Sequence, residues 1–473
     1  MSIARLTART HRISNWDPED IQAWESGNKD IARRNLAWSV IAEHVGFSIW
    51  SIWSVMVLFM PQAVYGFSAA DKFLLGATAS LVGAVLRIPY TVATATFGGR
   101  NWTMFSAFVL LIPTVGTLWL LAHPGLPLWP YLVCAALAGL GGGNFASSMT
   151  NINAFYPQRL KGWALGLNAG GGNIGVAVVQ VVALLLIAVA GNRAPYWVCA
   201  IYLVLLVIAG LGAAVFMDNL EQHKIDLSAM RSMLSVSDTW VISLLYIGTF
   251  GSFIGFSFAF GQVLQITFVA GGQATTQAAL HAAQVAFLGP LLGSLTRVYG
   301  GKLADRVGGG RVTLAVFVGM ILAAGVLVGV SAHHDHSRGD TTAATMIGYV
   351  VGFVALFVLS GIGNGSVYKM IPSIFEARSR SLGVSEDERQ HWSRATSGAL
   401  IGFASAVGAL GGVGINMALR QSYLISGSAT GAFGVFISFY VAASALTWGR
   451  YARGPVRGAA TLPMRLEPAR ADA

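Results

Sequence analysis

The stretch AFLGPLLGSLTRVYGGKLADRVGGGR, residues 286–311, decides the fold, because Arg297 lies in its apolar part and a glycine-rich loop follows. A second stretch, LVGAVLRIPYTVATATFGGR at residues 81–100, places Arg87 in the same way. Each arginine precedes a Gly-Gly pair by about eleven residues. At ~1.5 Å per helical residue this offset is about 16 Å, close to half of the roughly 30 Å hydrocarbon core of a membrane. Two arginines at matching depth predict one central site for an anion.

The composition of the 473 residues places most of the chain in lipid. Hydrophobic residues make up 55% and charged residues 11%, and the mean hydropathy is +0.63. A soluble domain carries about 25% charged residues. Apolar windows of ~20 residues recur along the whole chain. We therefore predict an all-α integral membrane protein with about 12 transmembrane helices.

The positive charge follows a membrane topology. The formal net charge is +10, and basic residues concentrate before the first span, in alternate loops and after the last span. Because cytoplasmic loops carry the excess of Lys and Arg, both termini are expected in the cytoplasm, in a multi-pass protein of the cell inner (cytoplasmic) membrane. The charge therefore does not indicate nucleic acid as a partner. Cys134 and Cys199 lie in apolar spans and are expected to be buried side chains without a redox or metal role.

A polar stretch at residues 217–238 predicts a cytoplasmic linker between two halves of about six spans each. The other expected segments are a cytoplasmic N-terminal segment (1–35), an N-terminal six-helix half (36–216), a C-terminal six-helix half (239–450) and a cytoplasmic tail (451–473). In the first of these, Asp17 is expected to cap a short helix that begins with Pro18.

Glycine patterns indicate that the two halves are pseudo-symmetric copies. GLGGG at residues 139–143 matches GIGNG at 361–365, in the fourth span of each half. The matches in the fifth spans are Gly166 with Gly402, Gly172 with Gly408, and Gly175 with Gly411. Such glycines usually let two helices approach closely, and close packing also leaves room for rocking. We expect this packing or gating role at Gly166, Gly170, Gly172, Gly408 and Gly411.

The loop GGKLADRVGGGR, residues 300–311, resembles the loop motif of the major facilitator superfamily, and it falls between the second and third spans of its half. At the same place the first half keeps only FGGRNW, residues 97–102. We expect Asp305 and Arg306 to pair with neighbouring helix ends and hold one conformation. The alternative is a positively charged loop that happens to contain an acid.

A longer signature, GLGGGNFASSMTNINAFYPQRLKGWALGLNAGGGNIGVAVVQ, occupies residues 139–180. It resembles the nitrate signature of the nitrate/nitrite porter family, the NarK-type members of the major facilitator superfamily. IGFASAVGALGGVG at 401–414 resembles a second copy, and the likeness extends from about Trp38 to Trp448. The resemblance implies the major facilitator fold of two pseudo-symmetric six-helix halves, and a carrier of nitrate and nitrite that works by alternating access.

The two arginines suit such a substrate. An intramembrane arginine by default faces the bundle interior and marks a pathway. The alternative for Arg87 and Arg297 is a buried salt bridge, but acids of suitable depth are scarce in the spans. Guanidinium is planar and presents forked donors, so two of them can grip a planar monoanion with three acceptors. We predict that both arginines bind the substrate.

Three aromatic residues are the next candidates. Tyr246 and Phe250 lie at i and i+4 on the seventh span and share one face, and Phe145 lies at the corresponding depth on the fourth. Such spacing most often means simple packing. The resemblance instead implies that all three surround the anion, with Tyr246 donating through its hydroxyl. Apolar walls would also favour the weakly hydrated nitrate and nitrite over sulfate or phosphate.

Polar groups within the spans complete the candidates. Asn168 and Asn173 carry amides that need a partner in lipid. Asn173 either donates to the anion or bonds across helices, and the resemblance favours the substrate site. Ser405 in the second signature is a similar but weaker case. Glu43, in the first span, is either a proton-coupling site or a structural partner for an arginine or a helix end.

Electrostatics suggests how transport is coupled. An empty, occluded site holds two desolvated like charges, so the loaded carrier should cross more readily, which predicts nitrate/nitrite exchange. Glu43 acting as counter-charge would instead give proton-coupled symport. A facilitator for another small anion or for an organic cation, and a nitrate sensor without turnover, are further alternatives. No metal set, nucleophile triad or nucleotide loop is present, so we expect no enzyme activity and no cofactor. The expected partners are the two anions and the lipid bilayer, and the expected state is a monomer.

Overall fold

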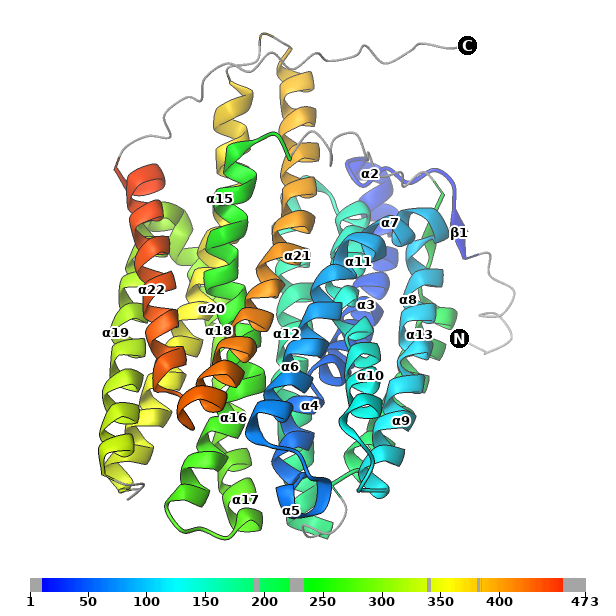
Figure 1. The fold of residues 1–473 in the computed structure, drawn as a ribbon. Helices are drawn as coiled ribbons and strands as arrows, with labels where there is room; N and C mark the ends of the chain where they lie inside the picture. The colour runs from blue at the N-terminus through cyan, green and yellow to red at the C-terminus, as the bar shows by residue number, and fades with distance from the viewer. Residues whose placement is uncertain are drawn as a thin grey trace.

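The computed structural model describes residues 11–190, 195–221, 234–337, 342–380, 383 and 385–453. Figure 1 shows a bundle of long helices that run between two faces of the molecule. The elements up to the linker are β1 (Arg12–Ile13), α2 (Ile21–Ala23), η1 (Trp24–Asn28), α3 (Lys29–Trp50), α4 (Trp53–Met56), η2 (Val57–Phe59), α5 (Gln62–Tyr65), α6 (Ala69–Val85), α7 (Arg87–Phe97), α8 (Gly99–Val109), α9 (Leu111–Ala122), α10 (Leu128–Ala138), α11 (Leu140–Phe155), α12 (Gln158–Ala190), α13 (Trp197–Phe216) and β2 (Asn219–Leu220). The elements after it are α15 (Ser237–Tyr246), η3 (Ile247–Gly251), α16 (Ser252–Ala270), α17 (Thr275–Ala286), α18 (Leu288–Val307), α19 (Gly309–His336), α20 (Ala343–Ser379), α21 (Glu386–Ser426), α22 (Thr430–Thr447) and η4 (Trp448–Ala452).

The described part of the chain contains 11 helices long and apolar enough to cross a membrane, and α6 with α7 forms a twelfth span, bent by 41°. The prediction of an all-α protein with about twelve spans is therefore confirmed. Breaks between α6 and α7, α8 and α9, and α17 and α18 each lie three residues before a proline: Pro89, Pro113 and Pro290. Proline cannot donate to the carbonyl four residues earlier, and its ring clashes with that turn.

The backbone supports the predicted internal repeat. Gly98 and Gly308, which follow the two arginines at the same offset, have φ angles of 88° and 97°. Each ends one helix and begins the next, α7 to α8 and α18 to α19. A positive φ is accessible to glycine at little cost, which explains the residue type at both corners. The two halves therefore turn the same corner with the same residue.

The glycines of the fifth spans also behave as pairs. A Cβ on Gly172 would clash with the carboxyl of Glu43, and one on Gly408 would clash with the ring of Tyr246. A Cβ on Gly175 would clash with the carbonyl of His44, which follows Glu43. A Cβ on Gly411 would clash with the carbonyl of Ile247, which follows Tyr246. A Cβ on Gly166 or Gly402 would meet no atom. The surroundings of the three pairs therefore agree with the alignment read from the sequence.

Two buried aspartates fix the ends of the linker. Asp218 accepts from Arg34 (2.7 Å) and Asn35 (3.0 Å) of α3. Asp238 accepts from Arg450 Nε (2.9 Å) and from Arg378. We call the face that carries these two aspartates the linker face, and the opposite one the far face. Because carboxylates are costly to bury without partners, these contacts hold each linker end to its own half.

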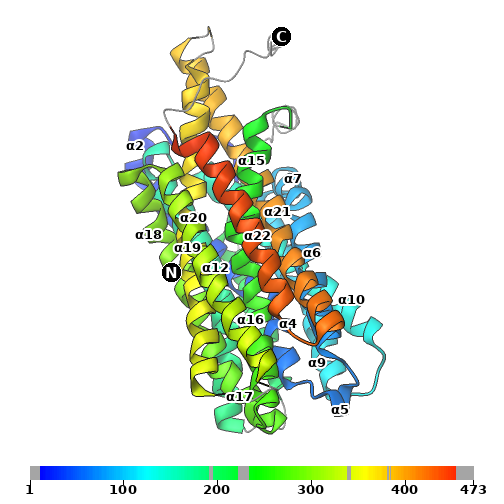
Figure 2. The ribbon, with the colours of Figure 1, turned by 60° about the vertical axis from the view of Figure 1, so that its left-hand side comes forward.

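The ends of the described chain lie on the linker face too. β1 pairs in parallel with β2, next to Asp218, and Arg450 of η4 contacts Asp238. Figures 1 and 2 show α20 and α21 projecting beyond the other helices on this face. That the linker face is cytoplasmic stays a prediction. Parts of the predicted N-terminal segment (1–10), linker (222–233) and C-terminal tail (454–473) lie outside the described residues.

The expected cap of the first helix was wrong. Asp20, not Asp17, accepts from the Ala23 amide (3.0 Å) and begins α2. Asp17 accepts from Glu19 within the preceding turn (2.9 Å). The expected helix start was therefore displaced by three residues, because a turn that precedes a helix uses the same capping residues.

Candidate anion-binding site

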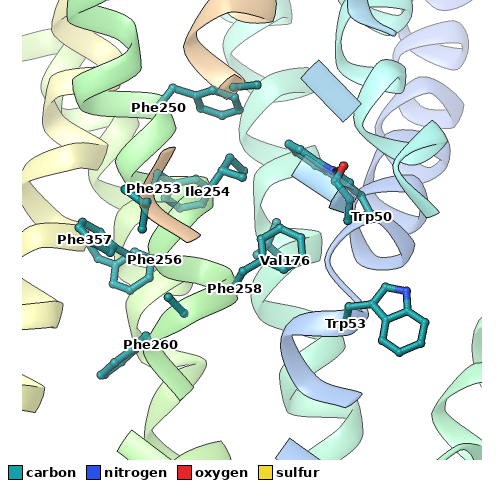
Figure 3. Packing of buried hydrophobic residues seen from close by; sticks show 14 of the residues in the cluster. Trp50, Trp53, Val176, Phe250, Phe253, Ile254, Phe256, Phe258, Phe260 and Phe357 are labelled. Atoms are coloured by element: carbon teal, nitrogen blue, oxygen red, sulfur yellow. Dashed lines mark hydrogen bonds between the residues drawn. The ribbon is translucent and has the colours of Figure 1, made fainter. Parts of the chain in front are cut away.

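The centre of the bundle is lined by aromatic side chains from both halves. Figure 3 shows Phe250 and Phe253 of the second half on one side and Trp50 and Val176 of the first half on the other. All four are buried. In this apolar environment a charge interacts far more strongly with its neighbours than it would in water.

Arg87 is the first residue of α7, at the bend before Pro89, and is fully buried (0% exposed). Its Nη1 donates to the carbonyl of Ser405 on α21, 3.0 Å away. Its guanidinium carbon lies 4.7 Å from the ring centre of Phe145 and 4.7 Å from that of Phe250. Nε and Nη2 have no partner among the described residues.

Arg297 comes from the other half, within α18, and is 7% exposed. Its Nη2 donates to the hydroxyl of Tyr246 at 3.3 Å. The guanidinium carbon lies 5.7 Å from the ring centre of Phe145 and 5.1 Å from that of Tyr368. Nη1 has no partner among the described residues.

The ring of Phe145 is therefore the meeting point of the two arginines. Cation–π contacts of this kind offset part of the cost of a buried guanidinium. Among the described residues neither Arg87 nor Arg297 forms a salt bridge, so the alternative of a buried ion pair is not what the structure contains. The result is a pair of positive charges from opposite halves with three donor nitrogens not used by the protein. Such an arrangement can bind a small oxyanion.

Tyr246 and Phe250 stack on each other, with ring centres 5.2 Å apart and an interplanar angle of 9°. The ring centre of Phe250 also lies 6.2 Å from the ring centre of Phe145. Because the Tyr246 oxygen accepts from Arg297, its own proton is available for a further acceptor. The three aromatic residues expected around the anion are thus brought together with both arginines.

The polar candidates differ in their surroundings. Asn173 is 1% exposed, and neither its Nδ2 nor its Oδ1 has a partner among the described residues. The hydroxyl of Ser405 is used within its own helix, on Gly402 (2.8 Å), and its contribution to the site is the carbonyl that accepts from Arg87. Asn168 donates to Glu43 at 2.6 Å and so is not free for an anion.

Glu43 lies in α3 and is 1% exposed. Its Oε2 accepts from Ser148 and Asn168, and its Oε1 has no partner among the described residues. Its charge acts on both Arg87 and Arg297. Glu43 therefore lies near the arginine pair, but its own hydrogen bonds are to the neutral side chains of Ser148 and Asn168.

Two further aromatic residues were missed by sequence reasoning. The ring centre of Trp50 lies 5.6 Å from the guanidinium carbon of Arg87. Its indole N–H donates to the carbonyl of Ala79 (2.8 Å), which fixes the ring in place. Tyr368 contacts Arg297 and lies 5.3 Å from Tyr246. The repeat offered a signal for Tyr368, since aligning 139–143 with 361–365 puts it one residue from the counterpart of Phe145. Nothing in the sequence distinguished Trp50 from its apolar neighbours.

Of the predicted packing and gating residues, Gly172 and Gly408 lie against Glu43 and Tyr246, and the loop motif lies apart from the site. Asp305 pairs with Lys369 of α20 at 3.0 Å, and both side chains are half-exposed. Arg306 is exposed. A Cβ on Gly166 or Gly170 would meet no atom, so the close packing expected there is absent from this conformation. Their gating role stays a prediction.

The fold and the site together define a membrane carrier whose two halves each contribute one arginine. The sequence matches the Major Facilitator Superfamily over residues 44–413. It is 35% identical to the nitrate/nitrite transporter NarU of Salmonella typhimurium, over 93% of this chain and 96% of that protein. It is 32% identical to the probable nitrate/nitrite antiporter NarK2 of Thermus thermophilus, with the same coverage.

A solved structure of the nucleoside transporter NupG has the same fold, with a TM-score of 0.63 at 10% identity, covering 88% of this chain and 100% of NupG. The chain belongs to the major facilitator superfamily and, within it, to the family of NarK-type nitrate/nitrite porters. It is a multi-span membrane transporter and not an enzyme.

Proposed function

We propose that this protein carries nitrate and nitrite across the membrane by alternating access, with one anion bound between Arg87 and Arg297. One observation carries the proposal: two guanidinium groups from opposite halves face the ring of Phe145 with unpartnered donors. The 35% identical relative is named as a transporter of both anions. A planar monoanion with three acceptors matches forked, fixed donors.

The contacts between the halves support alternating access. Arg87 joins the halves at the level of the site. Towards the far face, Gln262 donates to the carbonyl of Ala69 (2.8 Å) and Gln265 to that of Leu58 (2.7 Å). Towards the linker face, a Cβ on Gly166 or Gly402 would meet no atom. These contacts support a carrier whose halves are held together on the far face.

Exchange is the coupling mode that the charges favour. Without an anion, the occluded site holds two like charges removed from water, which costs several kcal/mol. A bound monoanion offsets part of this cost, so the loaded carrier crosses faster than the empty one. Nitrate and nitrite carry the same charge, and each relieves the arginine pair equally. Nitrate therefore enters most rapidly as nitrite leaves.

The aromatic walls add selectivity for weakly hydrated anions. Phe145, Phe250 and Trp50 cannot replace the water that a strongly hydrated anion loses. Sulfate and phosphate should therefore compete poorly with nitrate. The same two arginines exclude an organic cation, which would add a third positive charge.

The test is nitrate uptake into proteoliposomes of the purified protein, loaded with nitrite or with buffer alone. We expect uptake into nitrite-loaded vesicles to be at least about tenfold faster, equivalent to ~1.4 kcal/mol in the barrier of the return step. Equal rates in the two kinds of vesicle would contradict exchange as the main mode. No uptake in either would contradict nitrate transport itself.

A further inference from the structure

Glu43 occupies the position in the first half that Tyr246 occupies in the second. The repeat pairs Gly172 with Gly408, and these two glycines make room for the side chains of Glu43 and Tyr246 respectively. Tyr246 is bonded to Arg297, at the site. Pseudo-symmetry therefore puts a carboxyl group at the depth of the anion site, where a neutral hydroxyl group stands in the other half.

The partners of Glu43 suit both protonation states. Ser148 Oγ lies within hydrogen-bonding range of two acceptors, Glu43 Oε2 and the carbonyl of Phe145 (3.1 Å). When the carboxyl is ionised, Ser148 and Asn168 both donate to Oε2. When it is protonated, it can donate to Ser148 Oγ, which turns its own hydrogen to Phe145. No side chain has to move for a proton to be gained or lost.

A small cavity lies beside Glu43 within the first half. It is about large enough for one water molecule. Its lining consists of Ser39, Ala42, Glu43, Thr103, Ser106, Asn144, Ser147 and Ser148. Three of these residues carry a buried atom without a partner among the described residues: Ser39 Oγ, Glu43 Oε1 and Asn144 Oδ1. A donor and two acceptors on residues that line such a space suit one bound water, and the arginines are not among the lining residues.

The charged groups that act on Glu43 are the two arginines of the site, Arg87 of α7 and Arg297 of α18. The hydroxyl group of Tyr368 of α20 is neutral. On its own helix, His44 points instead to the Gly171 carbonyl of α12 (3.0 Å). The groups that α8, α11 and α12 present to Glu43 are neutral hydroxyls and amides. From α13, Tyr202 lies near Ser48, further along α3.

We infer that Glu43 is a proton-binding site linked to anion binding, next to a hydroxyl-lined water site of the first half. This inference rests on the proposed function. A bound anion adds a negative charge beside the carboxylate, and so favours its protonation; a proton on Glu43 removes that charge, and so favours the anion. Binding of the anion and protonation of Glu43 therefore favour each other, because both take place within the electrostatic field of the same two arginines.

The linkage separates two modes of one carrier. In exchange, nitrate and nitrite find Glu43 in the same protonated state, and no net proton crosses. When no internal anion is available, the empty site returns with Glu43 ionised, which leaves one uncompensated positive charge rather than two. The proton is released on the inner side, so net uptake moves one proton with each anion. Net uptake is thus a symport that requires Glu43 to release its proton before each return, whereas exchange requires no proton release.

The experiment is calorimetric titration of nitrate into the purified full-length protein at several pH values, each in two buffers of different ionisation enthalpy. We expect the wild type to take up as much as one proton per anion, and its affinity to rise by up to about tenfold per pH unit of acidification across the titration range. We expect Glu43→Gln to bind nitrate with a pH-independent affinity and no proton uptake. Glu25→Gln, an exposed acid on η1 paired with Lys29, is the matched control and should keep the wild-type linkage.

A second variant keeps the test decisive if Glu43→Gln does not fold. Ser148→Ala removes one donor to the carboxylate, which should move the midpoint of the pH dependence to higher pH while leaving its amplitude intact. Wild-type binding without proton uptake would overturn the inference and leave the arginine site standing. A pH dependence that persists in Glu43→Gln, or a midpoint unmoved in Ser148→Ala, would overturn it as well. Absence of nitrate binding in the wild type would instead overturn the proposed function.

Discussion

The two arginines hold equivalent places in the repeat but are held differently. Arg87 begins α7 at a proline-dependent bend, is fully enclosed, and reaches across to a carbonyl of the other half. Arg297 lies within α18, ten residues from its end, is 7% exposed, and bonds to Tyr246 of its own half. Arg87 therefore hydrogen-bonds across the interface, whereas the hydrogen bond of Arg297 stays within its own half and only its ring contact with Phe145 crosses. We conclude that the repeat has supplied one arginine bonded to the opposite half and one bonded to its own.

The neighbours of the arginines differ in the same way. The first half offers Glu43 where the second half offers Tyr246. A hydroxyl group keeps its charge state over the physiological range, whereas a carboxyl group can gain or lose a proton. The second half thus holds its arginine with a fixed group, and the first half holds a group that can titrate.

The largest effect is expected from the arginines themselves. Removing one partner of a buried, charged contact costs about 2–5 kcal/mol, so Arg87→Ala and Arg297→Ala should each reduce nitrate affinity roughly 100-fold. Arg87→Lys should lose more than Arg297→Lys, because Arg87 offers two unpartnered nitrogens of its fork to the anion and Arg297 offers one. Affinity and uptake should be measured side by side. Arg33→Lys, at the exposed start of α3, is the control and should keep the wild-type affinity. Equal losses of nitrate affinity in Arg87→Lys and Arg297→Lys would contradict the difference proposed between the two arginines.

The paired glycines should divide into two classes. Gly172→Ala and Gly408→Ala introduce clashes with Glu43 and Tyr246, and overpacking of this kind costs about 1–3 kcal/mol, so both variants should melt several degrees lower.

Gly166→Ala and Gly402→Ala meet open space and should melt at or slightly above the wild-type temperature, because alanine favours a helix over glycine. If these glycines pack when the linker face closes, both variants should nevertheless slow exchange. Unchanged melting temperatures in Gly172→Ala and Gly408→Ala would show that the helices at these two glycines pack less closely than the structure indicates.

Tyr246→Phe should have a moderate effect. It removes one neutral hydrogen bond, worth about 0.5–1.5 kcal/mol, while keeping the stack on Phe250. Nitrate affinity should fall roughly 3–10-fold without any change in its pH dependence. A loss as large as that of Arg297→Ala would mean that the hydroxyl positions the arginine rather than only binding the anion.

The smallest effect is expected at the loop motif. The Asp305–Lys369 pair is half-exposed, and such pairs contribute about 0–1 kcal/mol. Asp305→Asn should leave the melting temperature unchanged and alter the exchange rate by no more than about fivefold. A large loss of exchange with intact folding would establish the gating role predicted for this motif.

Much of the candidate site could be anticipated because its residues break a simple rule. An arginine, an asparagine or a glutamate inside an apolar span is conspicuous, so Arg87, Arg297, Asn173 and Glu43 were found by type alone. Trp50 breaks no such rule, and only the packing of α3 against α6 places it under Arg87. The pair between Lys369 of α20 and Asp305 of α18 likewise depends on which helices pack together.

The sequence by itself determined the membrane spans, the division into two halves and the matched depth of the two arginines. These follow from apolar length and from helical rise, which are local properties of the chain. Only the tertiary structure decided that Phe145 lies against both guanidinium groups, that Arg87 bonds across the interface, and that Asn168 holds Glu43. Those contacts join residues far apart in the chain, and helix packing alone sets which side chains meet.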